Sequence, residues 1–305
     1  MMYLLLLVGF ILLIKGADLF VDGASSIAGL LKIPSIIIGL TIVAMGTSAP
    51  EASVSLTAAL NGSNSLSLGN IIGSNIFNLL VVIGVSAILH PIASQKDIIN
   101  RDLWWNLGVT GVLFIFLFDL HLSRVEGILL LIGMAVYLFV LIRNALHNRT
   151  ASESQKVMSP LKSILYILIG LGAVIWGGNL VVHNASLIAE SLGMSSTLIG
   201  LTIVAIGTSL PELVTSITAA RKGDSGIALG NAVGSGLFNI MFILGTTAVI
   251  TPLTAVPELL IDTAILFVVG ILLLIFIRTK KETNRIEGLL CVLCYIGYSA
   301  YIILR

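Results

Sequence analysis

Two glutamates occur where acidic side chains are rare. Glu51 and Glu212 each lie well inside a long apolar stretch of this 305-residue sequence, and neither stretch contains a Lys or Arg. An ionised carboxylate at the centre of a bilayer is costly to insert and is rarely kept without a partner. Two protonated, packed glutamates are the alternative. Because the same acid recurs at equivalent places among polar residues, we favour bound cations as the missing countercharge.

The residues before each glutamate are polar and predict a broken helix. In the run Gly46-Thr47-Ser48-Ala49-Pro50, Pro50 has no N–H to donate to the carbonyl of Gly46, and its ring crowds that turn. Unpaired carbonyls at membrane depth are tolerated where they line a cavity. Thr47 and Ser48 precede Glu51 by four and three residues, so we expect the three side chains to share a region. Thr208 and Ser209 stand in the same relation to Glu212. A kink that serves only helix packing is the alternative, but it does not explain the glutamates.

The next apolar stretch in each half supplies amide and hydroxyl oxygens. Ser74 and Asn78 lie four residues apart, as do Ser235 and Asn239, so each pair occupies one helix face. Packing alone is the competing interpretation of this face. Carboxylates, amides, hydroxyls and freed carbonyls, with no Cys or His among them, suit hard ions such as Ca²⁺ and Na⁺.

These residues belong to an internal duplication. Residues 38–51 (IGLTIVAMGTSAPE) and 199–212 (IGLTIVAIGTSLPE) are identical at twelve of fourteen positions. At the same offset of 161, residues 68–78 and 229–239 are identical at seven of eleven positions. A fixed offset maintained over this length indicates two copies of one structural unit.

The elements that carry these motifs are predicted to be membrane spans. Hydrophobic residues make up 57% of the chain and charged residues only 10%, far fewer than in a soluble domain. Ten apolar stretches are long enough to cross a bilayer. They cover residues 3–20, 34–60, 66–89, 103–120, 124–143, 161–182, 195–220, 226–250, 257–277 and 286–304.

Five spans per copy is an odd number, so the second copy enters the membrane from the opposite face. The sequence therefore predicts an all-α, polytopic membrane protein with ten transmembrane helices in two inverted five-helix repeats. We expect one membrane domain, with repeats at 1–143 and 161–305 and a linker at 144–160.

Positive charge predicts the orientation. Thirteen of the sixteen Lys and Arg residues fall on the side of the linker, and such residues are enriched in cytoplasmic loops. We therefore expect a cytoplasmic linker, both termini outside, and a multi-pass protein of the plasma or inner membrane. The net charge of +1 gives no indication of a nucleic-acid partner. No loop is long enough for a regulatory soluble domain, and no catalytic motif indicates an enzyme.

The paired GTSxPE and GSxxFN motifs resemble the α-repeats of the calcium/cation antiporter superfamily, nearest its prokaryotic sodium/calcium exchanger branch. The likeness extends over essentially the whole chain. It implies ion ligands at Thr47, Ser48, Glu51, Ser74 and Asn78, and at Thr208, Ser209, Glu212, Ser235 and Asn239. It adds the backbone carbonyls of Ala44 and Ala205, with Ca²⁺ between the glutamates and Na⁺ beside it.

The resulting hypothesis is a secondary antiporter that exchanges Ca²⁺ for Na⁺ by alternating access, with both ions as substrates and no cofactor. Many relatives have an acid where this chain has Asn239, including those that co-transport K⁺, so its absence argues against K⁺ dependence. A H⁺/Ca²⁺ antiporter of the same superfamily is the nearest alternative. A passive cation channel is an alternative of a different class.

Overall fold

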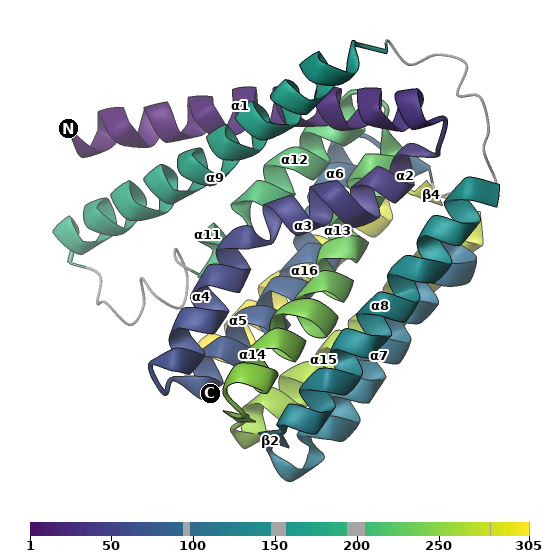
Figure 1. The fold of residues 1–305 in the computed structure, drawn as a ribbon. Coiled ribbons are helices and arrows are strands. Elements are labelled where there is room, and N and C mark those ends of the chain that lie inside the picture. The colour runs from purple at the N-terminus through teal and green to yellow at the C-terminus, as the bar shows by residue number, and fades with distance from the viewer. Residues whose placement is uncertain (94–97, 148–156, 194–204, 281, 305) are drawn as a thin grey trace.

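The computed structural model of this chain is built almost entirely of helices, and it describes residues 1–93, 98–147, 157–193, 205–280 and 282–304. The first half contains α1 (Met2–Leu31), α2 (Ser35–Ile38), η1 (Gly39–Val43), α3 (Ala44–Thr47), α4 (Ala49–Leu60), α5 (Asn64–Phe77), η2 (Asn78–Val82), α6 (Ile83–Leu89), η3 (Ile98–Asp102), α7 (Leu103–Phe116), η4 (Leu117–Asp119) and α8 (Arg124–His147). The second half contains α9 (Pro160–Ser191), α11 (Ala205–Gly207), α12 (Leu210–Arg221), α13 (Ser225–Phe238), η6 (Asn239–Leu244), α14 (Gly245–Ile250), α15 (Pro257–Lys280) and α16 (Arg285–Leu304). Figure 1 shows their arrangement.

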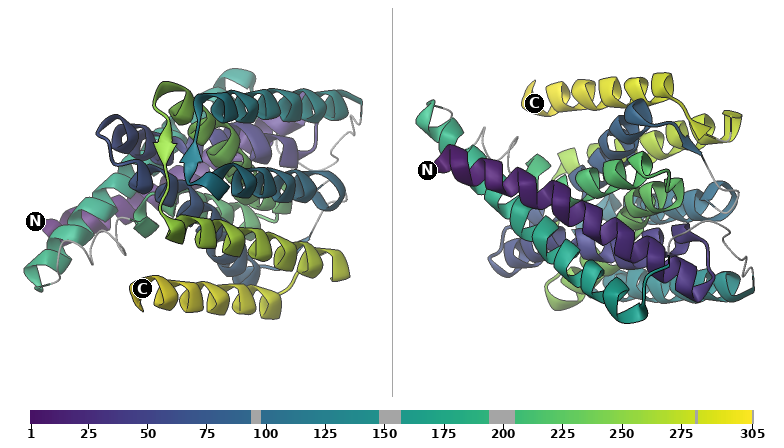
Figure 2. Two further views of the ribbon diagram at one scale, coloured as in Figure 1. Left: turned by 90° about the horizontal axis from the view of Figure 1, so that it is seen from below. Right: turned by 90° about the horizontal axis from the view of Figure 1, so that it is seen from above.

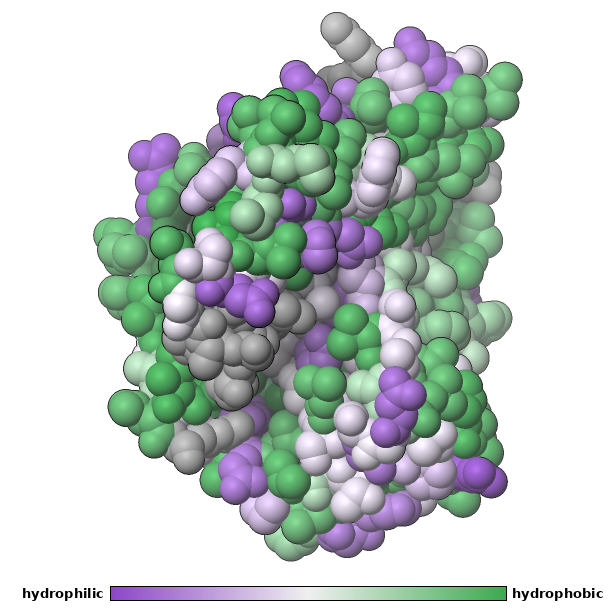
Figure 3. All heavy atoms as spheres, turned by 90° about the vertical axis from the view of Figure 1, so that its left-hand side faces the viewer, coloured by the Kyte–Doolittle hydropathy of each residue, from purple (hydrophilic) through white to green (hydrophobic). Residues whose placement is uncertain are grey.

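The helices have the lengths and surfaces of membrane spans. Within the described ranges, eight helices are long and apolar enough to cross a bilayer, and the bent pair of Ser35–Thr47 with Ala49–Leu60 makes a ninth. The predicted span at 195–220 begins outside the described residues, and α11 and α12 are its described part. Large apolar side chains such as Phe139, Leu168 and Ile275 are exposed, and hydrophobic residues cover much of the face in Figure 3. The predicted polytopic all-α fold is confirmed.

The predicted break before Glu51 is present. The two parts of this span meet at Ser48 at an angle of 46°, and Pro50 lies in the first turn of α4. The second copy has the matching break, at Thr208 and Ser209 between α11 and α12. Proline is tolerated in a first helical turn because the N–H it lacks has no intrahelical partner there.

Two short strand pairs relate the halves by an inverted two-fold. β1 (Ile92–Ala93) pairs antiparallel with β4 (Glu282–Thr283), and β2 (His121–Leu122) pairs antiparallel with β3 (Leu253–Thr254). The offset of 161 converts β1 into β3 and β2 into β4. Each pair therefore joins one half to the other, and the two pairs are symmetry mates. The predicted inverted repeat is confirmed.

The helices α1 and α9 cross the remaining helices as a pair, as Figures 1 and 2 show. Their backbones meet along a glycine seam. A Cβ at Gly16 would lie 2.9 Å from the carbonyl oxygen of Gly170, and one at Gly177 would lie 2.8 Å from that of Gly9. Adding 161 converts Gly9 and Gly16 into Gly170 and Gly177, so this contact is two-fold symmetric as well.

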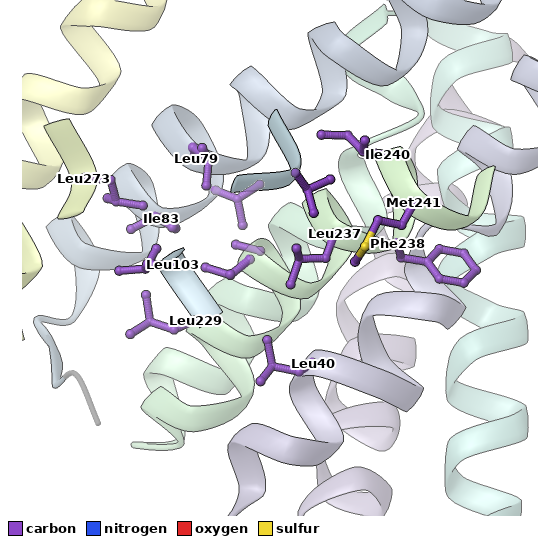
Figure 4. Packing of buried hydrophobic residues seen from close by; sticks show 14 of the residues in the cluster. Leu40, Leu79, Ile83, Leu103, Leu229, Leu237, Phe238, Ile240, Met241 and Leu273 are labelled. Atoms are coloured by element: carbon purple, nitrogen blue, oxygen red, sulfur yellow. The ribbon is translucent and has the colours of Figure 1, made fainter. Parts of the chain in front are cut away.

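The helix α13 is the centre of the core, and every residue from Gly226 to Phe238 is buried. Figure 4 shows its Leu229 and Leu237 among apolar side chains of other helices. A Cβ at Gly234 would lie 2.7 Å from the Cα of Leu40, in the span that carries Glu51. The glycines of α13 thus allow a close approach to the broken helix of the other repeat.

Candidate cation-binding site

The two glutamates lie at equivalent places in the fold and are fully buried. Glu51 is in the first turn of α4 and Glu212 in the first turn of α12, and both have 0% exposure. The free N–H groups and dipole of a helix N-terminus favour a negative charge there. The broken helices thus bring two carboxylates into the interior of the molecule.

Each carboxylate is held by a hydroxyl from the opposite repeat. Ser209 Oγ donates to Glu51 Oε1 at 3.0 Å, and Ser48 Oγ donates to Glu212 Oε1 at 3.1 Å. The two hydrogen bonds are symmetry mates. The sequence predicted that Ser48 and Glu51 lie in one region. In the structure, Ser48 donates to the glutamate of the other repeat, Glu212, and Ser209 donates to Glu51.

Several buried oxygens around the glutamates have no hydrogen-bond partner. They are Glu51 Oε2, Glu212 Oε2, Ser74 Oγ, Asn78 Oδ1 and Asn239 Oδ1. Buried polar atoms in folded proteins are nearly always hydrogen-bonded, so each exception requires an explanation. All five are oxygens that hard cations accept as ligands, and all five belong to residues that the sequence indicated.

Ser235 and Ala44 complete one side of this cluster. Ser235 Oγ is 3.4 Å from Glu212 Oε1 and 3.5 Å from the carbonyl oxygen of Ala44. That carbonyl also accepts from the backbone N–H of Ser48 at 3.1 Å. It lies 3.4 Å from Thr47 Oγ1 as well, so donors from both the broken helix and α13 surround the Ala44 carbonyl.

The threonines and Ala205 are less directly connected to the carboxylates. Thr47 is buried, but its Oγ1 is hydrogen-bonded to Asn231 Oδ1 at 2.9 Å and to the carbonyl of Val43 at 3.1 Å. Thr208 is half-buried, and Ala205 begins α11 at the edge of the described residues. Their part in a cation site remains a prediction.

Two asparagines missed by the sequence reasoning support the glutamate backbones. Asn70 Nδ2 donates to the carbonyl of Glu51 at 3.3 Å and to Ser55 Oγ at 2.9 Å. Asn231 Nδ2 makes the equivalent bonds, to the carbonyl of Glu212 at 3.1 Å and to Ser216 Oγ at 2.9 Å. Both belong to the LGN triplet, which is identical in the two repeats, so the signal was present in the sequence.

A π-helical turn begins at each predicted asparagine ligand. η2 starts at Asn78 and η6 starts at Asn239, directly after α5 and α13. Wide turns of this kind are rare and are frequently found at functional sites. These turns were not predicted from the sequence.

A cavity lies beside the breaks that precede Glu51 and Glu212. Its volume is about 610 Å³, and it is lined by Pro50 and Ser53 of α4, Asn179 and His183 of α9, and Thr208 and Pro211. The lining thus includes the residues adjacent to Glu51 and Glu212. His183 is an exposed residue on this wall.

The sequence matches the family described as "Sodium/calcium exchanger protein" over residues 1–143 and 162–304. The chain belongs to this family. The predicted resemblance is therefore confirmed, and the chain is a multi-pass membrane protein of the exchanger family. The matched segments contain both glutamates and both sets of buried oxygens.

Individual relatives agree with this assignment along almost their full length. The "Putative antiporter CaxA" of Alkalimonas amylolytica is 42% identical over 304 residues, which cover 96% of this chain and 95% of the relative. The "Sodium/calcium exchanger MaX1" of Methanosarcina acetivorans is 34% identical over 338 residues, with 97% of each chain covered. A solved structure of the sodium-calcium exchanger NCX_Mj, soaked with Na⁺ and Sr²⁺, is similar with a TM-score of 0.88 and 33% identity, covering 98% of this chain and 97% of that one.

Proposed function

We propose that this chain exchanges Ca²⁺ for Na⁺ across the membrane, with both ions as substrates at the site around Glu51 and Glu212. One observation carries the proposal. Two carboxylates are buried together, and neither forms a salt bridge with any of the described residues. Burial of unpaired charges is costly. A single Ca²⁺ between the two carboxylates balances both of them.

The ligand set also accounts for exchange. Ca²⁺ takes about six to eight oxygen ligands in flexible geometry, and the unpartnered carboxylate, amide and hydroxyl oxygens are of that kind. Na⁺ ions at the same centre compete for the same oxygens. Because both cargoes cannot be held at once, loading of one requires release of the other. The exchanger relatives, which are named for sodium and calcium, support this choice of ions.

Access to the site differs between its two sides, which supports alternating access. The cavity separates α9 from α4 on one side. On the other side α1 packs against α12, and Leu210 and Val214 of α12 pack against the cluster that contains Leu13 and Ala17. Lys222, at the end of α12, forms salt bridges with Asp22 at 2.7 Å and Asp18 at 3.4 Å.

This ion pair has no charged counterpart in the other repeat. The residues equivalent to Asp18 and Asp22 are Asn179 and His183, on the wall of the cavity, and Asn61 is equivalent to Lys222. We propose that the open cavity is the extracytoplasmic route, and that movement of α1 and α9 opens the other side.

The orientation is also a proposal. We infer one membrane domain with repeats at 1–143 and 161–305, a cytoplasmic linker at 144–160, and both termini outside a plasma or inner membrane. The positive residues of the linker side support it. The segments 60–64 and 221–225 are symmetry equivalents, and an inverted two-fold relation puts them on opposite faces.

Single cysteines at Ser63 and Arg221 test this orientation. Both residues are exposed, whereas Ser225 is half-buried and its hydroxyl accepts from the N–H of Ala93. In a Cys291→Ala/Cys294→Ala background, an impermeant thiol reagent applied outside intact cells is expected to label S63C but not R221C. After permeabilisation both are expected to react. Labelling of R221C alone in intact cells would reverse the orientation, and labelling of both would contradict the inverted arrangement.

Ion coupling is tested with the purified protein in sealed vesicles. Uptake of radiolabelled Ca²⁺ is expected to follow an outward Na⁺ gradient, to stop when Na⁺ is also added outside, and to need no K⁺. The physical reason is competition of Na⁺ and Ca²⁺ for one set of oxygens. Scintillation counting of filtered vesicles provides the rate.

Imposing a pH gradient without Na⁺ is the decisive comparison. Full Ca²⁺ uptake under that condition, with no effect of Na⁺, would replace the proposal with H⁺/Ca²⁺ exchange. Ca²⁺ uptake down its own gradient that needs no counter-ion would identify a passive channel. Vesicles without protein provide the leak control.

A further inference from the structure

The side chain of Asn75 joins the two repeats beside the proposed site. Asn75, on α5, is buried with 2% exposure. Its Nδ2 donates to the backbone carbonyl of Gly236 at 3.1 Å, and its Oδ1 accepts from Asn239 Nδ2 at 3.0 Å. Both polar atoms of the Asn75 carboxamide are therefore engaged, so it has little capacity to bind a cation itself.

These two bonds determine which way the Asn239 amide faces. A backbone carbonyl can only accept a hydrogen bond, so Asn75 must direct its nitrogen toward Gly236 and its oxygen toward Asn239. Asn239 must then direct its own nitrogen toward Asn75. The Asn239 oxygen is left on the opposite side, buried and without a partner.

The equivalent asparagine of the first repeat has no such support. The residue at the position equivalent to Asn75 is Gly236, which has no side chain. Accordingly, neither Oδ1 nor Nδ2 of Asn78, the counterpart of Asn239, has a hydrogen-bond partner. The two asparagines are equivalent in sequence but differ in how firmly their amides are oriented.

We propose that Asn75 is a positioning residue that holds the Asn239 carbonyl oxygen toward the transported cation. An amide presents either an oxygen, which attracts a cation, or an NH₂ group, which repels it. Fixing the amide in advance removes the free-energy cost of orienting it on binding. The inference rests on the proposed function, because it concerns a ligand of the same site.

Asn75→Leu, which has similar size but no polar atoms, tests the inference in vesicles. We expect the KM for Ca²⁺ to rise by about 3- to 10-fold, the usual consequence of losing one hydrogen bond, with kcat changed by less than about twofold. Asn75→Ala is the second variant, for use if leucine prevents folding. Size-exclusion chromatography checks that each variant is intact.

Double mutants separate positioning from general packing. Residues that act through one another give non-additive effects, whereas independent residues give additive ones. In the Asn239→Ala background, Asn75→Leu is therefore expected to raise the KM little further. In the matched control background, Asn78→Ala, it is expected to raise the KM by its full fold-change. Full additivity in both backgrounds would overturn the inference, as would an unchanged KM in both Asn75 variants.

Calorimetric titration with Ca²⁺ measures the Kd of the same purified proteins, which does not depend on transport. If wild-type protein binds Ca²⁺ but shows no Na⁺-driven uptake, the proposed function fails, while the coupling between Asn75 and Asn239 is still decided by the Kd values. Equal Kd values for wild type and both Asn75 variants would overturn the positioning role alone.

Discussion

Glu51→Gln and Glu212→Gln are each expected to abolish Na⁺-driven Ca²⁺ uptake in vesicles. Each substitution keeps the size of the side chain but removes half of the negative charge available to a divalent ion. Loss of one partner from a buried, desolvated charge pair weakens binding by roughly two orders of magnitude or more. The rate of uptake and the Kd from calorimetry are both expected to show this loss.

Glu190→Gln is the matched control, because it removes an exposed carboxylate near the end of α9. Its uptake is expected to equal that of wild type. All three variants should reach the membrane in similar amounts, since glutamine is neutral and fits the same space. Uptake near the wild-type rate in either buried variant would contradict the two-carboxylate site.

Gly170→Leu is expected to separate α1 from α9 and to abolish activity through helix packing, with no change in the charge of the site. A Cβ at Gly170 would lie 2.5 Å from the backbone nitrogen of Phe20 and 2.7 Å from the carbonyl oxygen of Gly16. Backbone atoms cannot rotate away as a side chain can, so the helices must move apart. We expect the free energy of unfolding to fall by about 3 kcal/mol or more, the upper range for overpacking. Thermal unfolding in detergent measures the change.

Gly172→Leu provides the control on the same helix, two residues away. Gly172 is exposed, and a Cβ there meets no atom of the described residues within 4 Å. Its thermal stability and uptake are expected to match wild type, apart from the small helix-favouring effect of replacing glycine. Equal stability of Gly170→Leu and wild type would contradict the close contact of α1 and α9.

Much of the architecture follows from local patterns in the chain. Hydropathy predicts where spans occur, because each span must cross the same thickness of hydrocarbon. Pro50 and Pro211 act within their own helices, so the breaks before Glu51 and Glu212 are readable from sequence. The duplication with an odd number of spans requires inversion. The residues of the candidate site could be named for the same reason, since each belongs to one of two repeated motifs.

The pairing of these residues was decided only by the tertiary structure. Ser48 holds Glu212 rather than Glu51, and Asn75 reaches Asn239, because the two repeats interlock through α13 and the broken helix of the other copy. Such contacts join residues more than a hundred positions apart, and no local spacing specifies them.

The difference between the two sides of the site also required the structure. Near-identical repeats predict equivalent surroundings, yet a cavity lies beside α9 while Lys222 ties α12 to Asp22 of α1. Lys15 is nearer in sequence, but Lys222 is the partner that packing brings within reach. The amino-acid sequence by itself determined the inverted fold and the ligand types, because both depend on hydropathy and local backbone chemistry. Which oxygens face the ion, and which side is open, depend on how the repeats pack together.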